Sequence, residues 1–514
     1  MTQVLQSTRS TATAEHTRVT LGKVVVPPRT DPYWLDLLQR VGVAAVEPTA
    51  APGSVRVAFV PPEHGESSVE PLRRAGMVVV RGSATTPGTP RLRTVHGTGP
   101  LFDGCTAIAM PVAAVDRPVD IPRPLGRGSE LLLPLPSANA ARRAPAVLRA
   151  FPISPDHVVE EIVSGTDHGG LRRLVQNALR QAHHALGLPF ARNACIPLGF
   201  AGGLALRIDA DDFDAPATNA LCTALERTDL RATWFLDVER HARKGGAPLV
   251  RALATSHHEV QSHFFHHYTY RSRRRNHTNL ERAAALLLQW GVRADAAAAP
   301  FGTFHRGVAA ALHDGGTRWS SEFSAVYDDH PTRLTGSDQV PVHPVCPVLL
   351  ARAGVPEATI LDYFAGRLGQ ALAAGECAVL YGHPIGDLLR VPLLDRLRAE
   401  LDAHATAAGA PVWQPTLSEL HAFHVRRRDT EPQCELVGEF AVGNADRRVP
   451  LVLETTTGAR LTLGGACTVG HPMNATPQIA SSSWRTSSPP RRWQRWRRQR
   501  EIVLRRLLRE VRGR

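Results

Sequence analysis

The sequence predicts an α/β protein built from several domains. The chain has 514 residues, which at roughly 100–200 residues per domain corresponds to two to four domains. Hydrophobic residues make up 43% and charged residues 21%, and this composition excludes a mostly disordered chain and a coiled coil. In residues 21–150 and 200–425, short strand-like runs alternate with stretches of helical periodicity, which is the order that α/β folds show.

The N-terminal part is predicted as an open α/β sheet domain over residues 21–150. Residues 1–20 are rich in Ser and Thr and aperiodic, so we expect a disordered leader. Strands are predicted at 23–26, 55–60 and 77–81, and helices at 33–41 and 68–75. We find no phosphate-binding loop or nucleophile elbow here, which favours a binding or scaffold domain. Apolar positions at helical spacing over 155–190 predict a helical connector, residues 151–199.

The C-terminal part is predicted as a small β module followed by a basic tail. Residues 430–470 alternate apolar and polar positions around turn residues, and 471–514 read as a linker and an amphipathic tail. Arginine supplies 58 of the 60 basic residues, and 12 of these lie in 481–514. Because the rest of the chain is almost neutral, no nucleic-acid binding is expected. Trp and Arg over 491–512 suit an anionic membrane surface, with a docked helix or a loose extension as alternatives.

Targeting and cysteine patterns point to a cytoplasmic protein, with a membrane-peripheral location as the alternative. We find no apolar run approaching 18 residues and no basic segment followed by an apolar stretch at the N-terminus. The seven cysteines are scattered and never form CxxC, so neither a disulfide framework nor a cysteine zinc site is expected.

Reactive side chains follow several predicted strands of residues 200–425. Asp209 and Asp211 end one apolar run, and Asp212 is the next residue. His263 and His267 form HxxxH, and His383 ends a later run. If the two histidines lie on one helical turn, their imidazoles point the same way. Two histidines and a carboxylate leave a coordination position open for water, as in catalytic rather than structural metal sites.

These motifs resemble the polysaccharide deacetylase family, also called NodB-homology or carbohydrate esterase family four. The resemblance covers about residues 200–425 and implies a distorted (β/α) barrel with fewer than eight strands. It implies Asp209 as the catalytic base and His383 as the catalytic acid. It also implies a divalent metal, Zn²⁺ by preference, held by Asp211, His263 and His267. The expected activity is a hydrolase acting on a carbon–nitrogen bond, which removes the acyl group from an N-acylated sugar.

Two further motifs of the family and one Arg-rich run supply the candidate substrate-binding residues. The loop Pro300-Phe301-Gly302 matches its third motif, and Trp319 is the candidate for a pocket-lining Trp, with core packing as the alternative. Arg274, in the Arg-rich run after HxxxH, is a candidate for gripping a substrate phosphate, although such runs are usually solvated. Asp212 is the alternative metal ligand. Without a secretion signal, a cytoplasmic glycan precursor is the expected substrate.

One departure from the family pattern keeps a second function open. The family has an Arg in the third motif that orients the base, and this chain has Ala298 there. Arg207, Arg293 or an Arg of 271–275 are candidates to replace it. If none does, the alternative is a non-catalytic carbohydrate-binding or scaffold protein that retains the deacetylase fold. A third hypothesis is a membrane-peripheral adaptor that acts through the tail.

Overall fold

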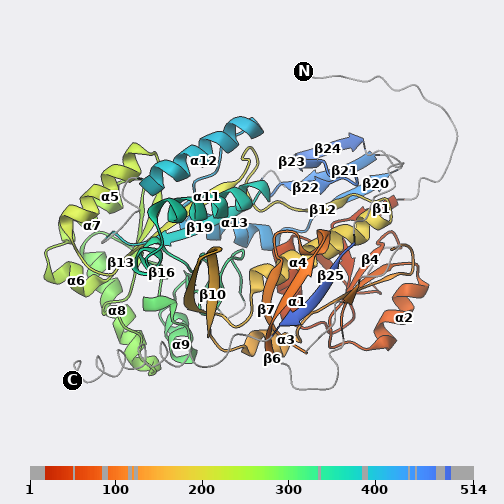
Figure 1. Cartoon of the computed structure of the whole chain (residues 1–514), viewed down its shortest axis with the longest axis horizontal. Coiled ribbons are helices and arrows are strands. Elements are labelled where there is room, and N and C mark those ends of the chain that lie inside the picture. Colours follow the sequence, from red (N-terminus) through yellow and green to blue (C-terminus); the bar gives the residue numbers. More distant parts are fainter. Residues whose placement is uncertain are drawn as a thin grey trace.

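The computed structural model describes residues 18–49, 53–83, 91–113, 119–120, 125–333, 337–384, 392–437, 440–445, 448–470 and 481–487. Helices and strands alternate through most of this length, as predicted for an α/β protein (Figure 1). Among the described helices, none has the length and apolar character needed to cross a bilayer.

The sheet that carries the candidate site has seven described strands in the order β18-β17-β16-β15-β14-β13-β19. These strands are β13 (Gly203–Ala210), β14 (Ala232–Leu236), β15 (Glu259–Ser262), β16 (Ala296–Ala297), β17 (Trp319–Ser320), β18 (Asp338–Gln339) and β19 (Cys377–Gly382). Every neighbouring pair is parallel, so all the carboxyl ends lie along one edge. The result is a partial barrel of fewer than eight strands in the described residues, which agrees with the predicted fold.

Amphipathic helices connect and cover these strands. They are α5 (Ala215–Arg227), α6 (Val238–Arg243), α7 (Ala247–Thr255), α8 (Arg273–Gln289), α9 (Arg306–Asp314), α10 (Pro347–Arg352), α11 (Glu357–Ala373), α12 (Pro392–Ala408) and α13 (Leu417–Asp429). In α8, Leu280, Ala283 and Leu287 are buried at helical spacing. The Ser272 hydroxyl caps this helix by accepting a hydrogen bond from the Arg275 backbone N–H.

The N-terminal part contains a second parallel sheet, as predicted. Its strand order is β3-β2-β4-β5-β9, from β2 (Lys23–Val25), β3 (Ala44–Val46), β4 (Val57–Val60), β5 (Val78–Gly82) and β9 (Glu130–Leu133). The helices of this part are α1 (Pro32–Val41), α2 (Glu66–Arg74) and α3 (Ala138–Arg143). The core beneath it includes Trp34, Phe59 and Phe102, the last from the short helix η1 (Pro100–Phe102).

The prediction of helix over 155–190 is correct only for residues 168–185. α4 (His168–Ala185) is a helix, and its apolar face packs into the N-terminal core. Residues before it form a hairpin of β10 (Val147–Ser154) and β11 (His157–Val163). The β-branched residues of HVVEEIV favour an extended backbone, which explains the strand.

The C-terminal β strands are shared with distant segments, which the sequence did not predict. The β module consists of β20 (Cys434–Val437), β21 (Phe440–Ala445), β22 (Leu451–Glu454), β23 (Arg460–Leu463) and β24 (Gly465–Gly470). β1 (Arg18–Leu21) pairs with β20, and β12 (Phe190–Asn193) pairs with β22. Residues 18–20 therefore belong to a strand and not to a disordered leader, because the unpaired edge of β20 offers them backbone partners.

Part of the predicted linker is also a strand. β25 (Ser483–Ser487) pairs with β6 (Arg91–Thr98) and β8 (Val119–Asp120) of the N-terminal part, where β6 also pairs with β7 (Ala107–Val112). Trp484 is buried in the N-terminal core, and this burial explains why a Ser-rich segment is ordered here. Figure 1 shows β25, near the C-terminus in sequence, lying beside the N-terminal elements. The tail, residues 491–512, lies outside the described residues, so its membrane contact stays a prediction.

Candidate metal and catalytic site

Arg207 and Asp209 form a buried two-point ion pair on β13. Residues two apart in a strand point to the same face, so both side chains leave β13 on one side. Arg207 Nε donates to Asp209 Oδ1 at 2.6 Å, and Nη2 donates to Oδ2 at 2.7 Å. Burial acts to raise the pKa of Asp209, but the Arg207 guanidinium outweighs it and holds that pKa below its ordinary value.

Arg207 takes the place of the arginine that the family has at the position of Ala298. Arg207 is fully buried, and its Nη1 also donates to the Ser321 hydroxyl at 3.0 Å. Ala298 is fully buried as well, on the loop after β16. Of the three predicted replacements for the missing motif arginine, Arg207 is therefore the one that contacts Asp209. Arg293, in contrast, is exposed.

Asp211, His263 and His267 meet in front of this pair. Asp211 follows the last residue of β13, and its Oδ1 lies 3.2 Å from His263 Nε2 and 3.0 Å from His267 Nε2. The two histidines are on the loop that follows β15, so the expected helical turn is not formed. The loop nevertheless brings the two rings to 4.9 Å between centroids. The carboxyl ends of β13 and β15 lie at the same sheet edge, which explains the meeting.

This group fits a divalent metal. One ligand atom from each of the three residues lies within 4.8 Å of the others. Asp211 Oδ1 and His267 Nε2 are both buried and lie 3.0 Å apart. Neither atom forms a hydrogen bond within the described residues. His263 Nδ1 donates to the Ala298 carbonyl at 2.8 Å, which leaves the Nε2 lone pair directed at Asp211. A carboxylate and imidazole lone pairs at one point are the donor set of zinc sites.

His383 approaches the same carboxylate from β19, the strand next to β13. Its Nε2 lies 3.7 Å from Asp211 Oδ2. Burial acts to lower the pKa of His383. A hydrogen bond with Cys346 and the charges of Asp211 and Asp209 outweigh burial and raise that pKa to about 10. Cys346 was not predicted as part of the site, because nothing in its local sequence marks it.

The loop Pro300-Phe301-Gly302 forms the short helix η2 at the rim of the site. Phe301 has a positive φ of 60°, is 60% exposed, and its ring centroid lies 4.9 Å from that of His267. A side chain at Gly302 would place Cβ 2.5 Å from the Phe323 ring, so this position requires glycine. The exposed Phe301 ring beside a proposed metal ligand is a surface on which a substrate can pack.

A buried glutamate that the sequence did not reveal holds this loop. Glu322 is fully buried, and its Oε1 accepts a hydrogen bond from the Ala299 backbone N–H at 2.9 Å. Burial raises the pKa of Glu322 above its ordinary value. Glu322 lies just after β17, at the same sheet edge as the other site residues. This position after a strand is the one feature of the sequence that could have marked Glu322 as a site residue.

Trp319 does not line the site, which corrects the prediction of a pocket Trp. Its side chain is fully buried, its Nε1 donates to the Ser418 hydroxyl at 3.2 Å, and its ring packs edge-on against Phe235. Trp319 belongs to β17 and points into the core between that strand and α13. A fully buried indole has no surface left to offer a sugar.

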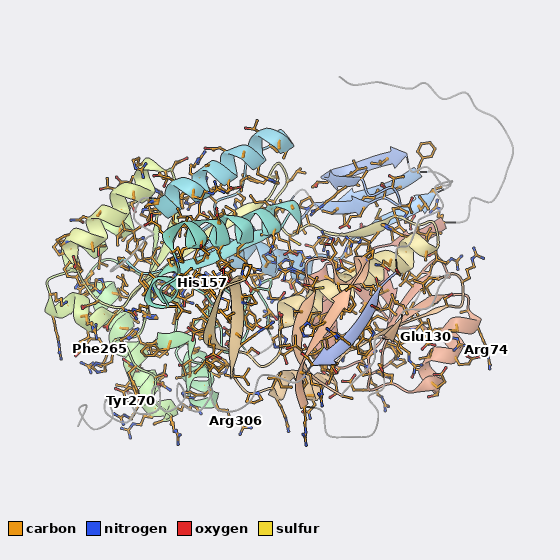
Figure 2. All side chains as sticks on the ribbon, in the orientation of Figure 1. Arg74, Glu130, His157, Phe265, Tyr270 and Arg306 are labelled. Carbon is orange, nitrogen blue, oxygen red and sulfur yellow. The ribbon has the colours of Figure 1, made fainter. Side chains whose placement is uncertain are left out.

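The other predicted residues take peripheral positions. Asp212 turns away from the histidines, and its Oδ1 accepts a hydrogen bond from Lys244 Nζ at 2.8 Å. His266 Nδ1 pairs with Glu239 at 2.7 Å, which occupies it outside the metal group. Arg274 is exposed on the first turn of α8. Next to it, the Arg275 guanidinium covers the Tyr270 ring at 4.1 Å, and Figure 2 shows Tyr270 at the outer surface of this part. Phosphate binding by Arg274 stays a prediction.

Comparison with known proteins supports the resemblance. Residues 205–319 match the polysaccharide deacetylase family. No similar sequence was found among curated proteins. Solved structures similar to the chain include a family 4 carbohydrate esterase from Streptomyces lividans in complex with acetate. It is 18% identical, with a TM-score of 0.30, and the match covers 39% of this chain and 88% of that one.

Two further solved structures come from Bacillus. A peptidoglycan deacetylase from Bacillus subtilis is 16% identical, with a TM-score of 0.32 and coverage of 44% and 93%. A CE4 family pseudoenzyme from Bacillus anthracis is 16% identical, with a TM-score of 0.31 and coverage of 43% and 65%. The family match includes Asp209, Asp211, His263 and His267. It confirms the predicted resemblance: residues 205–319 are similar to the polysaccharide deacetylase family.

Proposed function

We propose that the protein is a metal-dependent hydrolase that removes the acyl group from an N-acylated sugar. The observation that carries this proposal is the meeting of Asp211, His263 and His267 beside the buried Asp209–Arg207 pair. Water adds to the amide carbonyl, the carbon–nitrogen bond breaks, and the products are a carboxylate and an amino sugar. A divalent metal, Zn²⁺ by preference, bound by these three ligands would polarise the carbonyl and lower the pKa of water.

The residues around the ligands divide the proton transfers between them. Asp209 accepts the proton of the attacking water, because the two guanidinium hydrogen bonds of Arg207 keep it ionised and fix its orientation. His383 donates a proton to the departing amine, since its Nε2 lies 3.7 Å from Asp211 Oδ2 at the same end of the sheet. The exposed Phe301 ring packs against the sugar.

The alternative is a carbohydrate-binding or scaffold protein without catalysis. Ala298 in place of the family's arginine favours it. The Arg207–Asp209 pair favours catalysis, because it supplies the same guanidinium contact from the strand instead of the loop.

The test is the release of acetate from a soluble N-acetylglucosamine oligosaccharide by the full chain loaded with zinc. Activity that is lost in Asp209→Asn and after chelation supports the proposal. Binding of the oligosaccharide with no acetate released, by zinc-loaded protein of confirmed metal content, would favour the non-catalytic alternative.

A further inference from the structure

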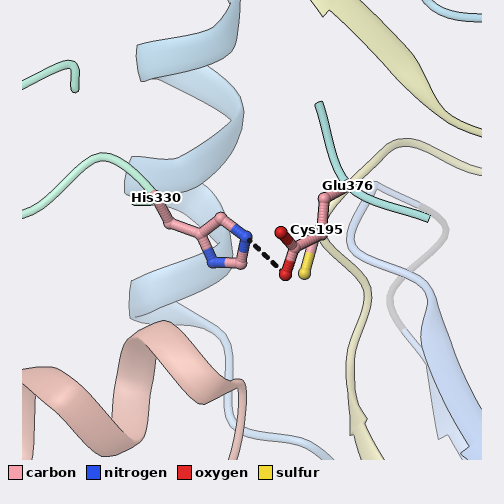
Figure 3. A group of neighbouring side chains, drawn as sticks. All are labelled: Cys195, His330 and Glu376. Carbon is pink, nitrogen blue, oxygen red and sulfur yellow. Dashed lines mark ion pairs between the residues drawn. The ribbon is translucent and has the colours of Figure 1, made fainter. Parts of the chain in front are cut away.

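A second group of potential metal ligands lies in the interior, away from the site described above. Cys195 follows β12, His330 lies between β17 and β18, and Glu376 directly precedes β19 (Figure 3). One ligand atom of each lies within 4.8 Å of the other two. Cys195 is fully buried, and His330 and Glu376 are each 5% exposed. Three distant segments thus bring a thiol, an imidazole and a carboxylate to one buried point.

The spacing suits a tetrahedral ion. His330 Nε2 and Glu376 Oε1 are 3.5 Å apart. Two ligands of a tetrahedral zinc, each about 2.05 Å from the ion, are about 3.3 Å apart, and a nitrogen and a sulfur ligand are about 3.6 Å apart. A cavity of about 40 Å³ adjoins His330 and Glu376, which is room for a water as the fourth ligand.

The hydrogen bond of His330 Nδ1 determines which ring nitrogen of His330 faces the other two ligands. Nδ1 donates to the Arg40 carbonyl at 3.1 Å, so the neutral ring carries a lone pair on Nε2. That buried Nε2 has no hydrogen-bond partner in the described residues, although the Glu376 carboxylate faces it. Two acceptors so placed repel each other unless a metal ion or a second proton on His330 lies between them. His263 of the first site is prepared in the same way, by the Ala298 carbonyl.

The same geometry excludes a catalytic relay of Cys, His and carboxylate. In such a relay the thiol and the carboxylate contact opposite nitrogens of the ring. Here Glu376 lies 3.5 Å from Nε2, Cys195 lies on the same side of the ring (Figure 3), and Nδ1 is occupied by a backbone carbonyl. A thiol with no exposed surface also has no access to a substrate.

Guanidinium groups hold two of the three ligands in place. Arg172 and Arg173 each donate to one oxygen of Glu376, at 2.8 Å and 3.2 Å. Arg192 donates to Cys195 Sγ at 3.3 Å. These contacts fix the ligand atoms, as groups around a metal site do. They also allow a competing explanation of the group, in which the guanidinium groups alone neutralise the negative charge of a Cys195 thiolate.

We propose that Cys195, His330 and Glu376 bind a structural Zn²⁺ that is distinct from the metal of the candidate catalytic site. The ion links the strand that joins the β module to the sheet that carries the catalytic residues, and through Arg40 it reaches α1 of the N-terminal part. Binding to the folded state alone would stabilise this junction. The scattered cysteines of the sequence gave no indication of such a site.

The experiment uses cobalt in the full chain, because only this second site contains a thiolate ligand. Cobalt-loaded wild type should show the near-ultraviolet thiolate-to-cobalt absorption, and zinc-loaded protein should contain two ions per chain. Cys195→Ser should lose the absorption and one ion. His263→Ala should keep the absorption while it loses the other ion. Cys105→Ser, which alters a buried thiol outside the group, is the matched control and should behave as wild type.

A second variant guards against loss of folding in Cys195→Ser. Glu376→Gln keeps the side-chain shape and should weaken cobalt binding at this site at least tenfold, with the absorption titrating at higher cobalt concentration. The proposal is overturned if cobalt-loaded wild type lacks the thiolate absorption, or if Cys195→Ser folds and retains two zinc ions. Either result would assign the group to a thiolate paired with arginines. Both readouts are independent of deacetylase activity, so they separate this proposal from the proposed function.

Discussion

Arg207 and Asp209 project from one face of β13 and are joined by two hydrogen bonds of 2.6 Å and 2.7 Å. The carboxylate is thereby oriented by its own strand, while the loop position that carries arginine in the family holds Ala298. A bidentate guanidinium contact fixes both the charge and the plane of a carboxylate.

Replacing Arg207 by Lys should lower turnover while the metal content stays unchanged. Lysine keeps a positive charge but cannot form the fork, so Asp209 loses its orientation. We expect kcat to fall about 10–100-fold. A weaker pair also raises the pKa of Asp209, so the acidic limb of the kcat/KM profile should move to higher pH. Arg293→Lys, which changes an exposed arginine, is the control. An unchanged pH profile in Arg207→Lys would contradict the positioning role.

The two aspartates should separate by metal content. Asp211→Asn should lose metal, because a neutral amide is a poor ligand. Asp209→Asn should keep the metal and lose about 10²–10⁴-fold in kcat, the usual contribution of a general base. Elemental analysis and acetate release measure the two effects. If Asp209→Asn loses metal and Asp211→Asn retains it, the two roles are reversed.

Phe301 and Trp319 should respond differently to truncation. Phe301→Ala removes an exposed ring, so KM should rise about 2–10-fold, with little change in melting temperature. Trp319→Ala leaves a cavity in the core and should cost about 3–5 kcal/mol of unfolding free energy. Thermal melts and steady-state kinetics distinguish them. If Trp319→Phe raises KM while stability stays normal, Trp319 contacts the substrate and its assignment to the core is wrong.

The buried His168 should make the fold sensitive to acid. Its Nδ1 lies 3.1 Å from the Tyr33 hydroxyl, and burial lowers its pKa from 6.5 to about 3. Between these values the unfolded chain binds the proton more strongly than the folded chain. The stabilisation is therefore complete above pH 6.5 and is lost as the pH falls towards 3, at about 1.4 kcal/mol per unit.

Chemical denaturation at several pH values tests this prediction. Between pH 6.5 and 5, His168→Gln should lose about 2 kcal/mol less than wild type. His257→Gln, at an exposed position, should match wild type. Equal losses in wild type and His168→Gln would show that His168 does not titrate in this range.

The sequence was sufficient to predict residues that lie at the ends of parallel strands. Asp209 lies at the carboxyl end of β13, Asp211 comes just after it, and His383 comes just after the neighbouring β19, so local patterns and the parallel order together place them in one site. The same reasoning located His263 and His267, although it misjudged their helical conformation. A loop can bring two residues to one point as well as a helical turn can, and the spacing alone does not distinguish the two.

What the sequence did not predict depends on contacts between distant segments. β25 is ordered by β6, which is almost 400 residues away, and β1 by β20. Trp319 could not be assigned to the core or the pocket, because a two-residue strand carries no alternation to show which face is buried. Glu322 and Cys346 have no motif around them, and only the folded chain brings them to the site.

In our proposal, Asp211, His263 and His267 hold a divalent metal. The most direct test is an anomalous difference map collected at the zinc absorption edge, from a crystal of the full chain grown with zinc. We predict a peak within about 2.0–2.2 Å of a carboxylate oxygen of Asp211 and of Nε2 of both histidines. A map that shows zinc bound elsewhere in the crystal but no peak between these three side chains would contradict the claim.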